Sequence, residues 1–258
     1  MAKKWARFPH ADKTFHYEGA ALKKNWARLH RGDAEPYPQA DAAQQAWRHY
    51  HAGEFQQAVE TGQAAGGSGV NAAIKAQAIY ANYLESAEKS RLALFEEAAA
   101  WADARRAEAP KDANAHYLYA YALGRYGQGI SVAKALAQGM GGKIKDALGL
   151  AMKLAAHHAD AHTAFGAYQA EVIAKVGALV AGLTYGAKKD SALEHFQKAL
   201  KLNPDSAIAR IEYANGLILL FGNERLADAT TLYEQAVACK PADAMERLDV
   251  ELARSELE

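Results

Sequence analysis

The sequence predicts an all-α protein, an α-solenoid built from stacked pairs of helices. Three observations lead to this prediction. Half of the 258 residues are apolar, which is enough to bury a sizeable core. No stretch shows the alternating apolar and polar pattern of a strand. One motif occurs twice, 37 residues apart: Ala192, Phe196, Ala199 and Pro204 recur as Ala229, Tyr233, Ala236 and Pro241.

The repeated motif explains how such helices pack. Alanines at this spacing share one face of a helix and let a neighbouring helix approach closely. The aromatic side chain fills the gap between helix pairs, and the proline ends the helix. Pro110 separates two further alanine-rich stretches, and Gly53, Phe55 and Ala58 resemble the turn and second helix of an earlier repeat. Because one pair cannot bury its apolar side alone, the pairs are expected to stack into one continuous core.

Two regions are expected along the chain: a basic N-terminal segment, 1–38, packed on the first repeats, and a helical-repeat domain, 39–258, closed by an acidic capping helix that starts near Ala242. The basic segment could contact an anionic surface, or it could lie against the protein's own acidic flank or in solvent. Against Asp12 and Glu18, its first 32 residues carry eight basic side chains: Lys3, Lys4, Arg7, Lys13, Lys23, Lys24, Arg28 and Arg31.

Two helical hairpins, 126–142 and 171–186, are longer than a standard repeat and rich in apolar residues and glycine. Both end in Gly-x-x-Lys-Asp. They either pack on each other and enlarge the core, or enclose an apolar cavity for an acyl chain or a similar hydrophobe. The residues predicted to line such a cavity are Ile130, Leu136, Met140, Val172, Val176, Leu179, Val180 and Leu183.

The repeats resemble the tetratricopeptide repeat (TPR) superfamily over about residues 110–240, and more weakly over 40–109. Residues 183–204, which follow a long apolar stretch, are similar to two long-helix subfamilies. These are the regulator of microtubule dynamics family and the periplasmic TPR protein associated with TRAP transporters. The resemblance implies lengthened helices around an apolar cavity or pore that binds a lipid or small hydrophobe. The membrane anchor or export signal that members can carry is not expected here.

The concave face of a TPR solenoid is lined by the first helix of each pair, and tyrosines on that face favour contact with a peptide. A non-enzymatic adaptor that binds a protein segment there is therefore the leading functional hypothesis. The alternative is a carrier or sensor of a lipid or other hydrophobic small molecule. The concave-face residues predicted to bind are Asn114, Tyr117, Tyr121, Ile208, Ile211, Asn215 and Ile218.

No catalytic or cofactor motif is recognised. The glycines at 66–69 lack the Lys and Ser or Thr of a phosphate-binding loop, there is no Gly-x-Ser-x-Gly, and the single cysteine, Cys239, has no activating neighbours in the sequence. His158 and His162 are four residues apart and could bind a metal with Asp160, although exposed polar residues are also expected at this repeat junction.

Composition limits the location and the partners. Lys and Arg number 30 and Asp and Glu number 30, so nothing favours specific binding of nucleic acid. A lone cysteine suits a reducing compartment, and the first ten residues are too charged for a signal peptide. The most apolar uncharged stretch, 176–187, is too short to span a bilayer. A cytoplasmic protein is predicted, with at most peripheral membrane contact through its basic N-terminal segment.

Overall fold

The computed structural model describes residues 5–258, and this part of the chain contains helices and turns but no strand. After a 3₁₀ turn (Lys13–Phe15) and α1 (Ala20–Leu29), the helices follow one another as pairs and end with α14 (Ala244–Ser255). The pairs are α2 (Asp41–His51) with α3 (Phe55–Ala65), α4 (Gly69–Tyr83) with α5 (Glu88–Glu108), α6 (Ala113–Ile130) with α8 (Met140–Leu154), α9 (Ala159–Val176) with α11 (Lys189–Leu202), and α12 (Ala207–Phe221) with α13 (Leu226–Val237).

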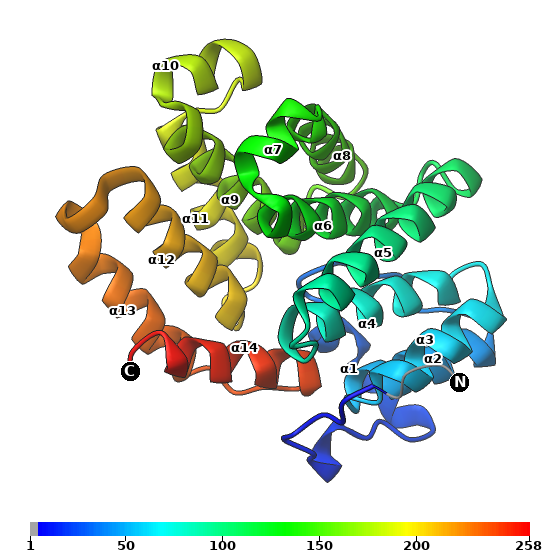
Figure 1. Ribbon diagram of the computed structural model, residues 1–258. Coiled ribbons are helices and arrows are strands. Elements are labelled where there is room, and N and C mark those ends of the chain that lie inside the picture. Colours follow the sequence, from blue (N-terminus) through cyan, green and yellow to red (C-terminus); the bar gives the residue numbers. More distant parts are fainter. Residues whose placement is uncertain (1–4) are drawn as a thin grey trace.

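Successive pairs stack side by side into a curved array, which confirms the prediction of an all-α solenoid (Figure 1). Two pairs carry insertions at the positions of the two lengthened hairpins. The first insertion is α7 (Val132–Ala137), and the second is α10 (Ala178–Val180) with a π-helical turn (Ala181–Tyr185). A 3₁₀ turn (Gly222–Arg225) joins α12 to α13.

The apolar stretch of the second insertion does not continue as one helix. Gly177 ends α9 with φ +80°, in the region that favours glycine, while its N–H still donates to the carbonyl of Ile173 at 2.9 Å. The chain therefore turns out of the α9 axis before it reaches Leu179 and Leu183.

Phe196 of α11 shows how the repeat motif packs. Its ring is fully buried and stacks on Tyr213 with ring centroids 5.1 Å apart. It lies directly on Gly166 of α9 and Gly216 of α12, where an added Cβ would come within 2.9 Å and 2.5 Å of ring atoms. The two glycines thus make room for the aromatic side chain that links three helices.

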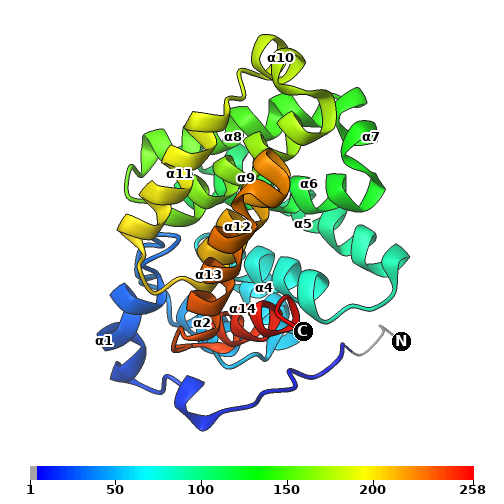
Figure 2. The same ribbon diagram turned by 90° about the vertical axis from the view of Figure 1, so that its left-hand side faces the viewer.

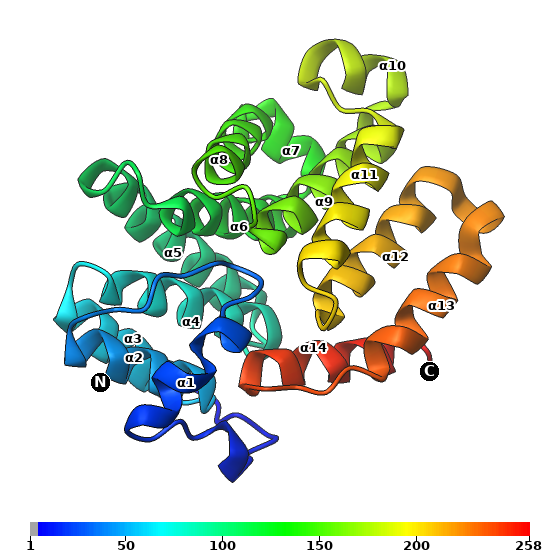
Figure 3. The ribbon, with the colours of Figure 1, turned by 180° about the vertical axis from the view of Figure 1, so that it is seen from behind.

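The array curls so far that α14 returns to the first repeats (Figures 2 and 3). Ala244 and Leu248 of α14 belong to the same apolar cluster as Trp47 and Tyr50 of α2. The Tyr50 hydroxyl also donates to the sulfur of Met245 at 2.8 Å. The last helix therefore contacts the beginning of the solenoid as well as its own neighbour α13.

The N-terminal segment takes part in this closure. Arg28 of α1 forms an ion pair with Glu246 of α14 at 2.6 Å, and Arg31 pairs with Asp205 at 2.7 Å. These two basic side chains thus lie against acidic groups of the C-terminal repeats. Two others of the basic segment, Lys3 and Lys4, lie outside the described residues. Among the helices of residues 5–258, none combines the length and apolarity needed to cross a membrane.

Replacement of Gly216 by alanine is expected to lower the free energy of unfolding by about 1–3 kcal/mol, because the new methyl group would overlap the buried ring of Phe196. Gly149, on the exposed side of α8, has no atom within 4 Å of an added Cβ, so Gly149→Ala should instead gain about 0.5–1 kcal/mol. Urea unfolding followed by circular dichroism measures both. Equal urea midpoints for the two variants would contradict the packing described here.

Candidate functional site

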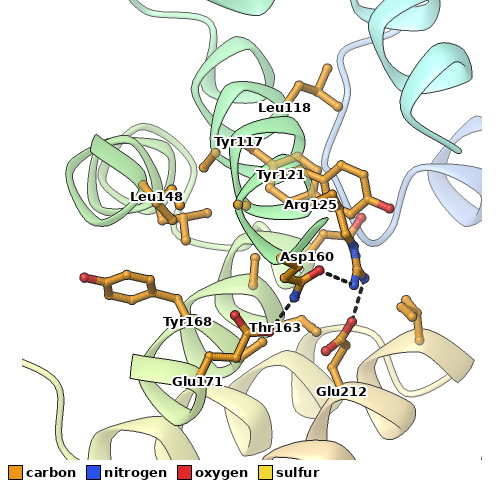
Figure 4. Close-up of a pocket in the computed structure, with 18 of the residues that line it drawn as sticks. Tyr117, Leu118, Tyr121, Arg125, Leu148, Asp160, Thr163, Tyr168, Glu171 and Glu212 are labelled. Atoms are coloured by element: carbon orange, nitrogen blue, oxygen red, sulfur yellow. Dashed lines mark hydrogen bonds and ion pairs between the residues drawn. The ribbon is translucent and has the colours of Figure 1, made fainter. Parts of the chain in front are cut away.

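A pocket lies on the concave side of the solenoid, and α4, α6, α9, α12 and α14 each contribute residues to its lining. Figure 4 shows the part of its wall formed by α6, α8, α9 and α12. Its cavity volume is about 130 Å³, within about 1150 Å³ of protein-free space that includes open solvent. The cavity alone is smaller than a typical site for a drug-sized ligand, so such a ligand would also occupy the open space in front of it. Because α14 has returned to the first repeats, its residues Met245 and Asp249 complete the wall opposite α9.

The first insertion supplies the apolar end of the pocket. Ser131 has φ +88° and caps α7, so the chain leaves α6 sharply and α7 folds back across it. Gly127 permits this approach, since a Cβ there would lie 3.0 Å from the methyl of Ala135. The apolar side chains that line this end come from α7, α8 and α9: Val132, Leu136, Met140, Ile144, Leu148 and Val172.

Tyr168 of α9 lines the same region. Its side chain is 7% exposed, and its hydroxyl is buried with no hydrogen-bond partner in the protein. Burial raises the pKa of this hydroxyl to about 12, so it is a neutral donor at physiological pH. An unsatisfied buried hydroxyl costs free energy, and a ligand that accepts its hydrogen bond would recover this cost.

The polar end of the pocket is a chain of hydrogen bonds that crosses from α12 to α9. Arg125 of α6 donates to Glu212 at 2.7 Å and to the side-chain oxygen of Gln128 at 3.1 Å, and Gln128 in turn donates to Glu171. Figure 4 shows Arg125, Glu212 and Glu171 directed toward one another. Burial, with repulsion from Glu212, raises the pKa of Glu171 to about 7, so this mouth of the pocket changes its charge near neutral pH.

Two more carboxyl groups line the pocket. Asp249 accepts a hydrogen bond from the Tyr83 hydroxyl, but burial and neighbouring acids still raise its pKa to about 8. Asp160 of α9 lies against Gly32, and its pKa is raised to about 6 by burial, with Lys75 opposing this effect. With Glu171 and Glu212 the pocket holds four carboxyl groups and two cations, Lys75 and Arg125, so its polar wall carries more acidic than basic groups.

A turn of the N-terminal segment lies behind the pocket wall and contacts Lys75, one of its lining residues. Asp33 accepts from the Lys75 ammonium at 2.5 Å and contacts the His30 ring at 2.9 Å, and all three side chains are buried. Burial opposes ionisation of Asp33, but the Lys75 ammonium outweighs it and keeps the pKa of this carboxyl well below its usual value. Asn114 of α6 donates to Glu35 at 2.7 Å and to the Asp33 carbonyl at 2.9 Å.

The residues predicted for the concave face divide into two groups. Tyr117, Tyr121 and Ile208 line the pocket, and Asn215 and Ile218 line a second hollow at its mouth. The other two are buried below the surface. Ile211 is 1% exposed in the core between α12 and α13, and Asn114 is 3% exposed and holds the N-terminal turn.

The residues predicted for a cavity are also divided. Leu136, Met140 and Val172 line the pocket, and Val176 packs beside the core of the central repeats. Ile130 ends α6 and is half-buried outside the pocket wall. Leu179, Val180 and Leu183 are placed elsewhere, because the break at Gly177 carries them onto the surface, where they are 75%, 48% and 82% exposed.

The three residues considered for a metal have other contacts. His158 is fully buried, accepts from the Ala161 N–H as the cap of α9, and lies 3.0 Å from the Asn114 side chain. His162 lies 2.8 Å from His195, and Asp160 faces the N-terminal turn. Within residues 5–258, no group of three or more His, Cys, Asp or Glu side chains is placed to hold a metal ion.

Six residues of the pocket were not predicted from the sequence: Lys75, Arg125, Tyr168, Glu171, Glu212 and Asp249. For two of them, the spacing in the sequence could have indicated the site. Arg125 follows Tyr117 and Tyr121 at intervals of four residues, and Glu212 follows Ile208 by four, so each shares a helix face with a residue already selected. Asp249 carried no such signal, since it reaches the pocket only through the return of α14.

In the Asp249→Asn variant, the free energy of unfolding is expected to fall less with rising pH than it does in the wild type. The folded carboxyl, with its pKa of about 8, keeps a proton that the unfolded chain releases near pH 4, so this group costs stability as the pH rises from about 4 to 8. The amide still accepts from Tyr83 and cannot ionise. Relative to the wild type, the variant should gain up to about 1.4 kcal/mol per pH unit between about pH 5 and 8. Denaturant unfolding at each pH measures this.

The matched control is Asp190→Asn, which changes an exposed aspartate of α11. Its pH profile should run parallel to that of the wild type. If Asp249→Asn also ran parallel to the wild type, the carboxyl at position 249 would not be the buried proton-binding group described here.

Comparison with known proteins identifies the fold but no family. No protein-family model matches the sequence, and no curated protein matches it. Among solved structures, the crystal structure of a thermophilic TPR protein from Thermus thermophilus is similar, with a TM-score of 0.56 and 16% identity over 83% of this chain and 98% of that chain. At this identity the similarity concerns the fold alone. The chain has a TPR-like fold.

Proposed function

We propose that this protein is a non-catalytic binding protein whose concave pocket takes an elongated hydrophobic small molecule, such as a lipid chain, with its polar group at the mouth. The observation that carries the proposal is the division of the pocket into two ends. One end is lined by the apolar side chains of the first insertion, and the other by the hydrogen-bonded chain through Arg125. A pocket with apolar walls and a few polar groups at one place suits an amphiphile.

The closed shape of the solenoid supports a small ligand over a long peptide. An open TPR groove leaves its whole concave side to a partner, but here α14 contacts the first repeats and the turn at 30–35 packs on Lys75 and Asn114. The remaining space is a pocket and not a continuous groove.

A second candidate, binding of a protein segment, is favoured by one observation at the mouth. Ile218 and Leu219 of α12 are 37% and 45% exposed beside Glu212 and Asn215, and they line the second hollow there. Exposed apolar side chains next to hydrogen-bonding groups are typical of a peptide-binding surface. This role would use the TPR-like fold as an adaptor, and the two functions need not exclude each other.

Ala167→Trp is expected to weaken binding of 1-N-phenylnaphthylamine, a neutral fluorescent hydrophobe, by at least about tenfold, because the indole would occupy the pocket. Ala174→Trp, on the exposed side of the same helix, is the matched control and should bind like the wild type. Leu136→Trp is a second blocking variant if the first fails to fold. Equal affinity in all folded variants would place the probe outside the pocket. Native mass spectrometry of the purified protein would also detect any hydrophobe that stays bound, as an increase in mass.

Ile218→Asp with Leu219→Asp should abolish binding of peptides selected from a phage-displayed library on the wild-type protein, while the affinity for 1-N-phenylnaphthylamine stays within about twofold. Leu226→Asp, at a leucine of α13 that is 48% exposed, is the control and should leave peptide binding unchanged. Selected peptides that bind the double variant as tightly as the wild type would rule out the mouth as a peptide site.

A further inference from the structure

The second insertion forms a short projection with exposed apolar side chains. It runs from Ala178 to Tyr185 and is bounded by two glycines with positive φ, Gly177 at +80° and Gly186 at +68°. Leu179 and Leu183 are 75% and 82% exposed, the two highest values among the large hydrophobic residues described. Leucines four residues apart in a helical turn point to the same side, so the projection presents one apolar surface.

Lysines flank this apolar surface in the sequence and occur in the first insertion, whose neighbour Lys145 comes within 3.1 Å of a Cβ added at Gly186. The segments 131–149 and 174–190, which contain both insertions, carry six lysines and two aspartates and no arginine or glutamate. Because the whole chain has equal numbers of acidic and basic residues, the remainder is acidic by the difference of four. The lysines that are exposed in these segments are Lys134, Lys143, Lys175 and Lys188.

The projection lies at one end of the molecule. Figures 1, 2 and 3 each place α10 at the end opposite α1, with α7 in the same half. The insertions that form this end also form the apolar end of the pocket, since Leu136 and Met140 line it and Tyr185 packs against Gly141. The exposed leucines are therefore joined to the pocket wall by a few residues.

A second copy of the chain is a poor partner for this surface. Stable protein interfaces bury about 1,200–2,000 Å² in total, far more than an eight-residue projection offers. Two copies that met here would also bring together two sets of lysines, which repel each other. An anionic lipid surface has neither difficulty, because it attracts the lysines and accepts the leucines at the boundary between headgroups and acyl chains.

We infer that the second insertion is a membrane-docking element, in which Leu179 and Leu183 enter the surface of an anionic lipid bilayer and Lys143, Lys175 and Lys188 contact its headgroups. Docking by this end would bring the apolar end of the pocket close to the membrane. The inference goes beyond the proposed function and does not depend on it, because the leucines and lysines can dock whether or not the pocket holds a lipid.

Vesicle flotation tests the inference. We expect the full chain to float with vesicles of equal parts phosphatidylglycerol and phosphatidylcholine in 0.1 M salt, and to remain unbound with phosphatidylcholine alone or in 0.5 M salt. Leu179→Ser with Leu183→Ser should reduce the bound fraction by about tenfold or more. Lys143→Gln with Lys175→Gln and Lys188→Gln should reduce it similarly, and these variants replace exposed side chains outside the pocket wall.

Two matched controls locate the docking element. Leu226→Ser removes an exposed leucine from α13, and Lys23→Gln with Lys24→Gln removes two exposed lysines from α1 at the other end of the molecule. Both should float like the wild type. Loss of flotation in the α1 variant alone would assign docking to the basic N-terminal segment and overturn the inference. It is also overturned if the wild type does not float, or if the leucine variant floats as well as the wild type.

Sedimentation velocity tests the other occupant of this surface. The wild type and the leucine variant should have the same mass in solution. A wild-type oligomer that dissociates in the leucine variant would show that a second copy covers the projection, and this would overturn membrane docking. Since flotation and sedimentation do not use the fluorescent probe, a failure here leaves the proposed pocket untouched, and a failure of probe binding leaves docking untouched.

Discussion

Helix α14 packs against α2, and this contact between the two ends of the solenoid decides the shape of its concave side. Without it the first helices of the pairs would line an open groove, and Met245 and Asp249 would not reach the pocket. Apolar burial supplies most of the stabilisation, since a fully buried leucine such as Leu248 contributes about 1.5–3 kcal/mol. The partly exposed pair of Arg28 with Glu246 contributes about 0–1 kcal/mol and chiefly sets how the ends align.

The N-terminal turn is held by buried charged groups of its own and of α4. Asp33 and Lys75 form a buried ion pair, whose net contribution to stability is small because both groups lose their hydration. Loss of either partner would leave the other charge unpaired, at a cost of about 3–5 kcal/mol. The pair, together with Asn114, thus fixes one position for the turn beneath the pocket. The polar contacts behind Lys75 are thus made within the protein itself, whereas the acidic groups at the mouth of the pocket face open space.

The helix pairs could be predicted because their signals are local. The spacing of Ala192, Phe196 and Ala199 describes contacts within one repeat and its neighbour, and the structure has them. The placement of Leu179 and Leu183 could not be predicted from composition, since their apolar character favoured burial while a single glycine turned them outward. Asp249 belongs to the pocket only through a contact between distant parts of the chain, which no local pattern records.

The closure also changes what kind of repeat protein this is. In an open solenoid each unit contacts only its neighbours, so folding can start anywhere and spread, and an end can fray without disturbing the rest. Here the Tyr17 hydroxyl donates to the carbonyl of Ala242, across 225 residues of sequence. Contacts of such separation raise the contact order, and proteins of higher contact order fold more slowly. Because each end packs on the other, we expect the two ends to unfold together, as they do in a globular domain.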